Sequence, residues 1–247
     1  MLKETDMNGV RKTARLFLML EPVPTKLSPM VVKHPFTDSG FVMTRGDGDN
    51  PVKMVNIMED QKALHQWREE KAAQIRAMKE PRELFAMLTK SYYMVFLKYA
   101  MPYLSQKDFS EYLGTAWICD ENPNSDPNFT TQKLVRLFKK ADPEALMTPE
   151  ERQQLHALPD SVTVYRGVTS FNAKRIKVLS WTLDRDTAQW FANRFGEKGT
   201  VYTAQIPKEH ICALFHGRNE SEIILDPKYL MDITPDQQPC SGMEMKM

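Results

Sequence analysis

The hydrophobic period of this chain changes near Pro159, and that change constrains the fold more than any other feature. Between residues 59 and 158 the apolar side chains recur at helical spacing, which predicts amphipathic helices. From residue 161 they alternate with polar side chains in VTVY, and apolar runs return in TVYTAQIP, ICALF and SEIILD, which predicts short strands. Helices followed by strands indicate an α+β protein, mostly helical in its first part and β-rich in its second.

The chain of 247 residues, with 42% apolar side chains, is long enough for one large domain or two small ones. We expect a mixed N-terminal region over residues 1–158, a compact core over 159–235 and a flexible tail over 236–247, or one continuous domain. In the N-terminal region, the segment LFLML is consistent with either a short buried strand or a helical turn. Short strands are expected between residues 30 and 58. Helices are predicted from Glu59 to Pro81, from about Glu83 to Tyr99, from Ser105, over TTQKLVRLFKKA and from the capping box at Thr148.

The 33 basic and 32 acidic residues nearly cancel, so no global charge points to nucleic acid or to a membrane surface. The apolar windows are far shorter than the ~20 residues of a membrane helix. The first residues, MLKETDMNG, lack the apolar core of a signal peptide, so we expect a cytoplasmic protein without a membrane partner. The three cysteines and five histidines show no metal-ligand spacing, and no metal site is expected.

Polar side chains stand out at two places in the β-rich part. Arg166 ends the strand VTVYR beside Gly167, where its planar fork suits a phosphate or carboxylate ligand, or a structural ion pair. IKVLSWTL is a predicted strand in which Ser180 and Thr182 flank Trp181, so that both hydroxyls share one face. No histidine base is adjacent, so the sequence does not indicate a serine hydrolase.

A pair of glutamates precedes another predicted strand. Glu220 and Glu222 lie two positions apart in N-E-S-E, so an extended backbone would place both carboxylates on the same side. Two like charges raise each other's pKa unless a cation or a hydroxyl donor stabilises them. Such a pair suits chemistry at a glycosidic bond, although an exposed acidic turn explains the spacing equally well.

In this order, Y-R-G on a strand, S-W-T before a helix and E-x-E leading an apolar strand resemble the Arg–Ser–Glu class of mono-ADP-ribosyltransferases. That class includes arginine-specific bacterial toxins and phage-encoded transferases. The resemblance covers roughly residues 160–230 and implies a split β-sheet catalytic core over residues 159–235. The middle motif of the family is usually Ser-Thr-Ser, whereas Trp181 occupies its centre here, and we expect that side chain to face away from the ligand.

The resemblance implies NAD⁺ as the ADP-ribose donor, with no metal. Arg166 would bind an NAD⁺ phosphate, and Gly167 would let the main chain approach the nicotinamide amide. Ser180, supported by Thr182, would orient the ribose and the catalytic glutamate. Glu222 would bind the ribose 2′-hydroxyl and stabilise the positive charge that develops as nicotinamide leaves.

The resemblance also implies an acceptor side. Glu220 would position or deprotonate the acceptor, and the turn before it, Phe215, His216, Gly217, Arg218 and Asn219, would recognise it. The E-x-E pair is similar to the arginine-modifying subgroup, so a protein arginine is the first acceptor and RNA or DNA the second. The basic helix over 133–140 and the cluster Lys174, Arg175 and Lys177 could guide a phosphate backbone, or be solvated surface. Trp190 and Phe191 are expected in the core rather than against a ligand.

The expected function is therefore transfer of ADP-ribose from NAD⁺ to a protein or RNA. The settings to consider are a bacterial toxin, a phage-defence effector and a phage factor that modifies its host, and a toxin would need a neutralising antitoxin protein. Two alternatives remain. An NAD⁺ glycohydrolase would need Glu222 but tolerate loss of Glu220, and a non-catalytic binding module on the same fold would need neither.

Overall fold

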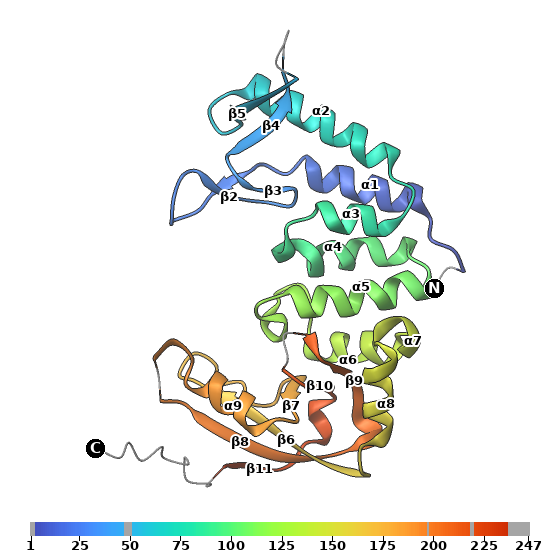
Figure 1. Cartoon of the computed structure of the whole chain (residues 1–247), viewed down its shortest axis with the longest axis vertical. Helices are drawn as coiled ribbons and strands as arrows, with labels where there is room; N and C mark the ends of the chain where they lie inside the picture. The colour runs from blue at the N-terminus through green and yellow to red at the C-terminus, as the bar shows by residue number, and fades with distance from the viewer. Residues whose placement is uncertain (1–2, 47–50, 197, 218–219, 237–247) are drawn as a thin grey trace. The chain divides into compact units, whose positions relative to one another are not determined.

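The computed structural model describes residues 3–46, 51–196, 198–217 and 220–236 (Figure 1). The predicted flexible tail lies outside the described residues except for Asp236. The chain divides into two compact units, Met1–Asn128 and Phe129–Met247. This division precedes the domain boundary expected at residue 158, because the helices that follow Asn128 pack on a strand of the second unit.

The first unit contains helices together with two small sheets. Its helices are α1 (Met7–Leu18), α2 (Gln61–Ala77), α3 (Pro81–Met87), α4 (Tyr93–Ala100) and α5 (Gln106–Cys119), with short 3₁₀ turns η1 (Lys90–Tyr92), η2 (Met101–Tyr103) and η3 (Pro123–Ser125). Between α1 and α2 the chain forms β1 (Val23–Pro24), β2 (Val31–His34) and β3 (Thr37–Ser39) in one sheet, and the pair β4 (Phe41–Arg45) and β5 (Val52–Asn56).

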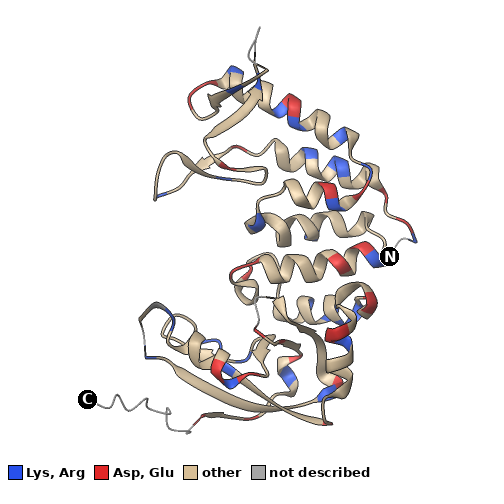
Figure 2. Ribbon diagram, in the orientation of Figure 1, with Lys and Arg blue, Asp and Glu red and all other residues tan. Residues whose placement is uncertain are grey.

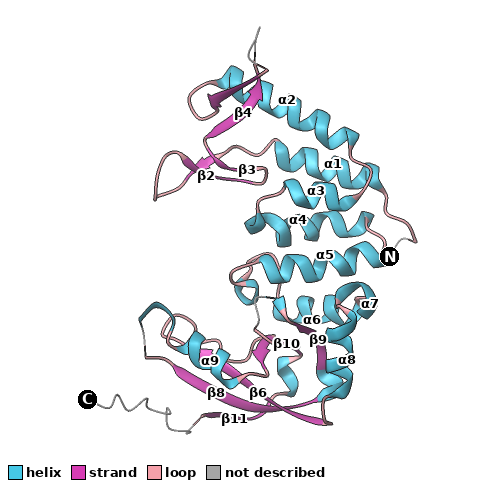
Figure 3. Ribbon diagram, in the orientation of Figure 1, coloured by secondary structure: helices cyan, strands magenta, loops and turns pink. Residues whose placement is uncertain are grey.

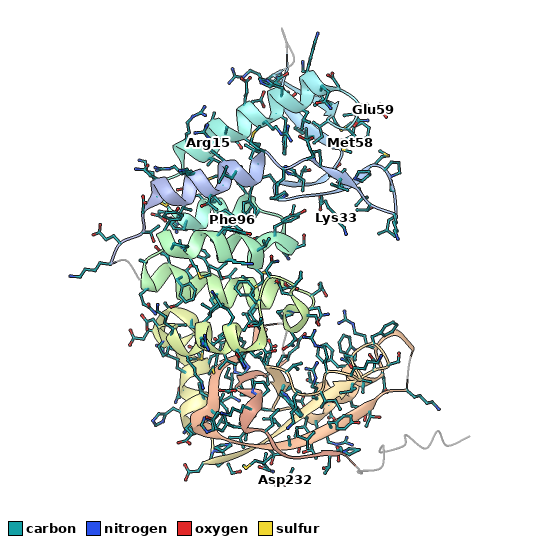
Figure 4. All side chains as sticks on the ribbon, turned by 180° about the vertical axis from the view of Figure 1, so that it is seen from behind. Arg15, Lys33, Met58, Glu59, Phe96 and Asp232 are labelled. Carbon is teal, nitrogen blue, oxygen red and sulfur yellow. The ribbon has the colours of Figure 1, made fainter. Side chains whose placement is uncertain are left out.

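Helices α1, α2 and α5 begin at side-chain caps, and the helices of the first unit share an aromatic core. The side chain of Asp60 accepts hydrogen bonds at the start of α2, and that of Ser105 does so at the start of α5. Phe96, labelled in Figure 4, is fully buried, and its ring packs edge to face against that of Phe85 with 5.3 Å between the ring centroids. Packing of the helices therefore rests on large apolar rings rather than on helix propensity alone.

The structure decides one N-terminal alternative and corrects one expectation. Residues 16–18 of LFLML form the last turn of α1, as the helical alternative predicts, and the buried face of this helix contains the small residues Gly9, Thr13 and Ala14. The helix expected from Glu83 to Tyr99 is interrupted, because the amide of Thr89 donates to the carbonyl of Pro35 at 2.8 Å. That long-range hydrogen bond holds the chain in an extended conformation between α3 and α4.

The second unit is a six-stranded antiparallel sheet with helices packed against it (Figure 3). Its helices are α6 (Thr131–Lys140), α7 (Pro143–Leu146), α8 (Pro149–Ala157) and α9 (Arg185–Ala192), with 3₁₀ turns η4 (Arg194–Gly196), η5 (Lys208–His210) and η7 (Pro227–Tyr229). Its strands are β6 (Ser161–Val168), β7 (Ser180–Thr182), β8 (Thr200–Pro207), β9 (Ile211–Phe215), β10 (Glu222–Leu225) and β11 (Met231–Pro235). The predicted capping box of α8, Thr148 with Glu151, is confirmed.

The strand order is β11-β8-β6-β7-β10-β9. Strands β6 and β8 pair along their whole length, from Ser161–Pro207 to Val168–Thr200, whereas β6 and β7 are joined at Tyr165 and Thr182. The sheet thus consists of two three-stranded halves with a short seam. The strand expected over IKVLSWTL is reduced to Ser180–Thr182, while the strands predicted from TVYTAQIP, ICALF and SEIILD are confirmed.

The predicted α+β class, with helices mostly in the N-terminal half, is confirmed. One face of the second sheet is apolar, and Val164, Trp181 and Ile223 are buried together in its core. In the described ranges no helix has both the length and the apolar character needed to cross a membrane.

Candidate functional site

Three neighbouring strands of the second unit carry the predicted site residues. Arg166 lies on β6, Ser180 opens β7, and Glu222 opens β10. Because β7 pairs with β6 on one side and with β10 on the other, the sheet brings together segments that are far apart in the sequence. The side-chain alternation of the strands then decides which groups can meet.

Ser180 and Glu222 are joined directly. The hydroxyl of Ser180 donates to Oε1 of Glu222 at 2.5 Å, within the range of a charge-assisted O–H···O⁻ hydrogen bond. In the antiparallel register Glu222 lies opposite Thr182, so its side chain shares the face of both β7 hydroxyls. Between the two hydroxyls, the indole of Trp181 lies in the apolar core of the sheet, where it is 2% exposed and donates to the carbonyl of Val178 at 3.1 Å.

Arg166 reaches the same position through the main chain. Its Nη1 donates to the carbonyl oxygen of Ser180 at 2.6 Å. Burial lowers the pKa of Arg166 to about 10, and the nearby charge of Glu222 opposes that shift. The Nε atom is buried and, among the described residues, has no hydrogen-bond partner. A buried N–H donor without a partner is costly, so this guanidinium is suited to an anionic ligand that would accept from it.

Thr182 and Glu220 are linked through the backbone. The hydroxyl of Thr182 donates to the main-chain carbonyl of Glu220 at 2.7 Å and accepts from the amide of Asp184 at 3.0 Å. The extended backbone assumed for the two glutamates is not present, because Ser221 between them has a φ of 42° and β10 begins at Glu222. The chain turns at Ser221, so strand alternation does not fix the direction of the Glu220 side chain.

Gly167 has a packing role that the sequence did not indicate. A Cβ at this position would lie 2.2 Å from the carbonyl oxygen of Ala188 and 2.5 Å from the amide nitrogen of Ala192. The missing side chain allows α9 to lie directly on β6, as Figure 3 shows. The predicted role of Gly167 beside nicotinamide remains a prediction, and its close approach to α9 accounts for the glycine independently.

The predicted acceptor turn is only partly described. The side chain of Phe215 is 1% exposed and its ring centroid lies 6.4 Å from that of Phe138, so it packs in the core rather than on the surface where an acceptor would bind. The amide of His216 donates to Oε1 of Glu151 at 2.7 Å, which fixes the start of the turn. Arg218 and Asn219 lie outside the described residues.

Glu151 is the site-supporting residue that the sequence did not single out. It is 6% exposed, and its second oxygen accepts from the amide of Thr148 at 2.8 Å as part of the capping box. One buried carboxylate therefore ties the start of α8 to the chain after β9. The capping-box motif was its only sequence signal, and that motif indicated a helix start rather than a tertiary contact.

The aromatic pair on α9 is more exposed than expected. Trp190 is 60% exposed, which corrects its assignment to the core, while Phe191 is half-buried. The buried face of α9 is formed by Ala188 and Ala192, one turn apart, so Trp190 falls on the other side of the helix. The guanidinium of Arg194 lies 5.6 Å from the centre of the Trp190 ring.

The two basic segments differ in their surroundings. On α6, Lys139 forms an ion pair with Asp226 at 2.7 Å, so part of that stripe has a structural partner. Lys174, Arg175 and Lys177 are exposed and line a hollow of about 430 Å³ with Ile233 of β11. Among the described residues, no group of three or more histidine, cysteine, aspartate or glutamate side chains could hold a metal ion.

Comparisons with known proteins give no relative. No protein-family model matches the chain. No curated protein and no solved structure matches it either.

Proposed function

We propose that the second unit is an NAD-dependent mono-ADP-ribosyltransferase that modifies a macromolecular acceptor. The observation that carries the proposal is the hydrogen bond from Ser180 to Glu222, beside an Arg166 guanidinium bonded to the carbonyl of Ser180. The order of the three motifs in the sequence, their placement on adjacent strands and the short seam between the halves of the sheet support this assignment.

On the donor side, Arg166 supplies the cation for a phosphate of NAD⁺. Its buried Nε–H has no hydrogen-bond partner in the described part of the chain, and a phosphate oxygen would satisfy this donor. Glu222, oriented by Ser180, accepts a hydrogen bond from the ribose 2′-hydroxyl. As the C1′–N bond to nicotinamide breaks, the bonding electron pair leaves with nicotinamide, and the carboxylate of Glu222 stabilises the positive charge left on the ribose.

On the acceptor side, the nucleophile bonds to C1′ and loses a proton to Glu220. A protein arginine is the first acceptor that we propose, because the E-x-E pair resembles that subgroup, and RNA is the second. The settings that suit such an activity are a bacterial toxin, a phage-defence effector or a phage factor acting in the host cytoplasm. A toxin would additionally need a neutralising protein partner.

The proposal is tested by incubating the full chain with NAD⁺ labelled in its ADP-ribose part and a bacterial lysate, then separating protein and RNA. We expect label in the protein fraction, and its loss with Glu222→Gln. Glu209→Gln is the matched control, because Glu209 is 78% exposed and lies in η5, away from the three site strands. Label that persists in the Glu222→Gln variant would overturn the site assignment.

The same experiment separates the alternatives. Label in RNA would identify nucleic acid as the acceptor, and free ADP-ribose as the main product would identify a glycohydrolase. A glycohydrolase would retain its activity in Glu220→Gln, whereas a transferase would lose label in the acceptor. A binding module would bind NAD⁺ without releasing nicotinamide.

A further inference from the structure

Helices α1 and α2 of the first unit run side by side in opposite directions. In the middle of α2, Nη2 of Arg68 donates at 2.9 Å to the carbonyl of Leu20, just after α1 ends. At the other end, Nε of Arg11 on α1 donates at 3.0 Å to the carbonyl of Met78, just after α2 ends. The two antiparallel helices therefore pack along their lengths, and side chains from both line the surface groove between them.

The groove between α1 and α2 has a volume of about 790 Å³. Its α1 wall is a single stripe, because Lys12, Arg15, Leu16 and Met19 recur at three- and four-residue spacing. The groove is part of one compact unit, so its walls are fixed by the packing of the two helices.

The groove is basic. Four cationic side chains, those of Lys12, Arg15, Arg68 and Arg76, line it with one carboxylate, that of Glu69. Figure 2 shows basic positions along both helices, and Arg15 projects where α1 and α2 meet (Figure 4). Arg68 is paired with Glu21, but within the described ranges no ion pair engages Lys12, Arg15 or Arg76. These three charges are available to an anionic partner.

Apolar side chains lie among these cations. Leu16 in the last turn of α1 is 65% exposed, and Met19, its C-cap residue, is 60% exposed. No phenylalanine, tyrosine or tryptophan lines the groove, so it lacks the stacking platforms with which proteins hold single-stranded bases. Exposed aliphatic anchors flanked by cations instead match an amphipathic helix whose apolar face is bordered by carboxylates.

We propose that the α1–α2 groove binds an acidic amphipathic helix of a partner protein. Leucine-like side chains of that helix pack on Leu16 and Met19, and its carboxylates pair with Lys12, Arg15 and Arg76. Because α1 has 12 residues, the groove accommodates about three turns of the partner helix. This inference concerns the first unit alone and stands whether or not the second unit transfers ADP-ribose.

The test is fluorescence anisotropy on the full chain with a labelled helical peptide of about 18 residues, leucine on one face and glutamate on the other. We expect a dissociation constant of about 10 µM that rises with salt. Arg15→Glu with Arg76→Glu, and separately Leu16→Ser with Met19→Ser, should each weaken binding about tenfold or more. All four side chains line the open groove, and unchanged circular dichroism establishes that the variants fold.

The matched control reverses two exposed lysines of the same unit, Lys26→Glu with Lys107→Glu, and so makes the same change in net charge. We expect this variant to bind the peptide as the wild type does. No binding at low salt, or equal weakening in the control, would overturn the proposal. It would also be overturned if a single-stranded RNA probe bound more tightly than the peptide and lost its binding in the groove variants, or if those variants instead dissociated a homodimer.

Discussion

The hydroxyl of Ser180 donates a 2.5 Å hydrogen bond to Oε1 of Glu222, although the two residues are 42 positions apart in the sequence. The contact exists because β7 lies between β6 and β10, with Glu222 opposite Thr182. A hydroxyl that orients a carboxylate in this way fixes the direction in which the carboxylate can act. Under the proposed function, Ser180 is therefore a positioning residue for Glu222.

Ser180→Ala should lower kcat about tenfold to a hundredfold, because Glu222 loses the donor that orients it. The KM for NAD⁺ should change little, since the serine carbonyl that binds Arg166 is retained. Steady-state release of nicotinamide measures both constants. Ser180→Thr keeps a hydroxyl and should restore part of the rate, whereas equal rates for serine and alanine would contradict the positioning role.

Under the proposed function, Arg166→Met should abolish NAD⁺ binding and lower the free energy of unfolding by about 1–3 kcal/mol. The loss of stability arises because the carbonyl of Ser180 loses its donor, and it is limited because burial, which lowers the pKa of Arg166 to about 10, already disfavours the charge. Calorimetric titration with NAD⁺ and urea denaturation give the two quantities. A purely structural arginine would show the same loss of stability with NAD⁺ binding retained, and that result would contradict the proposed role.

Gly167→Ala should destabilise the second unit by about 3 kcal/mol, because the new Cβ would meet the backbone of α9. The measurement is urea denaturation followed by the fluorescence of the buried Trp181. Gly196→Ala is the matched control, since no atom of the described residues lies within 4 Å of its Cβ position. Gly196→Ala should lower the free energy of unfolding by only about 1 kcal/mol, because alanine disfavours the φ of +73° at this position. Equal costs at the two glycines would contradict the close approach of α9 to β6.

His34 should make the first unit sensitive to acid. Burial lowers its pKa from 6.5 to about 4, and its Nδ1 accepts from the amide of Phe36 at 3.1 Å. The unfolded chain therefore binds the proton more tightly, so the free energy of unfolding should fall by up to about 3 kcal/mol between pH 6.5 and 4. Urea denaturation across that interval tests this. His34→Asn retains a hydrogen-bond acceptor but does not titrate, so the free energy of unfolding should depend less on pH in this variant. A pH dependence equal to that of the wild type would contradict the assignment to His34.

Local patterns predicted much of the second unit. Alternation identified β6, and apolar runs identified β8, β9 and β10; the side chain of Asp184 caps α9. These signals lie within a few residues of the elements that they specify. The residues of the candidate site could be proposed because their motifs fall on such elements.

The failures have a different physical origin. Thr89 is extended because its partner, Pro35, lies in another part of the chain, and no local pattern records that contact. Trp190 is exposed because α9 packs on the sheet through Ala188 and Ala192. Side-chain hydrophobicity alone would have placed the larger indole, rather than these alanines, in the core. The turn at Ser221 depends on a positive φ at a residue that is not glycine, and a single sequence gives no warning of it.

The left-handed conformation of Ser221 places the two glutamates on either side of a turn, so different contacts hold each of them. Glu222 is held on β10 by strand pairing and by Ser180, whereas Glu220 precedes the turn and is anchored through its carbonyl to Thr182. Substitutions before Ser221 can therefore redirect one carboxylate without moving the other. Under the proposed function, acceptor choice and NAD⁺ cleavage would be independently adjustable, and target specificity could be re-engineered in a few residues while the donor chemistry stays intact.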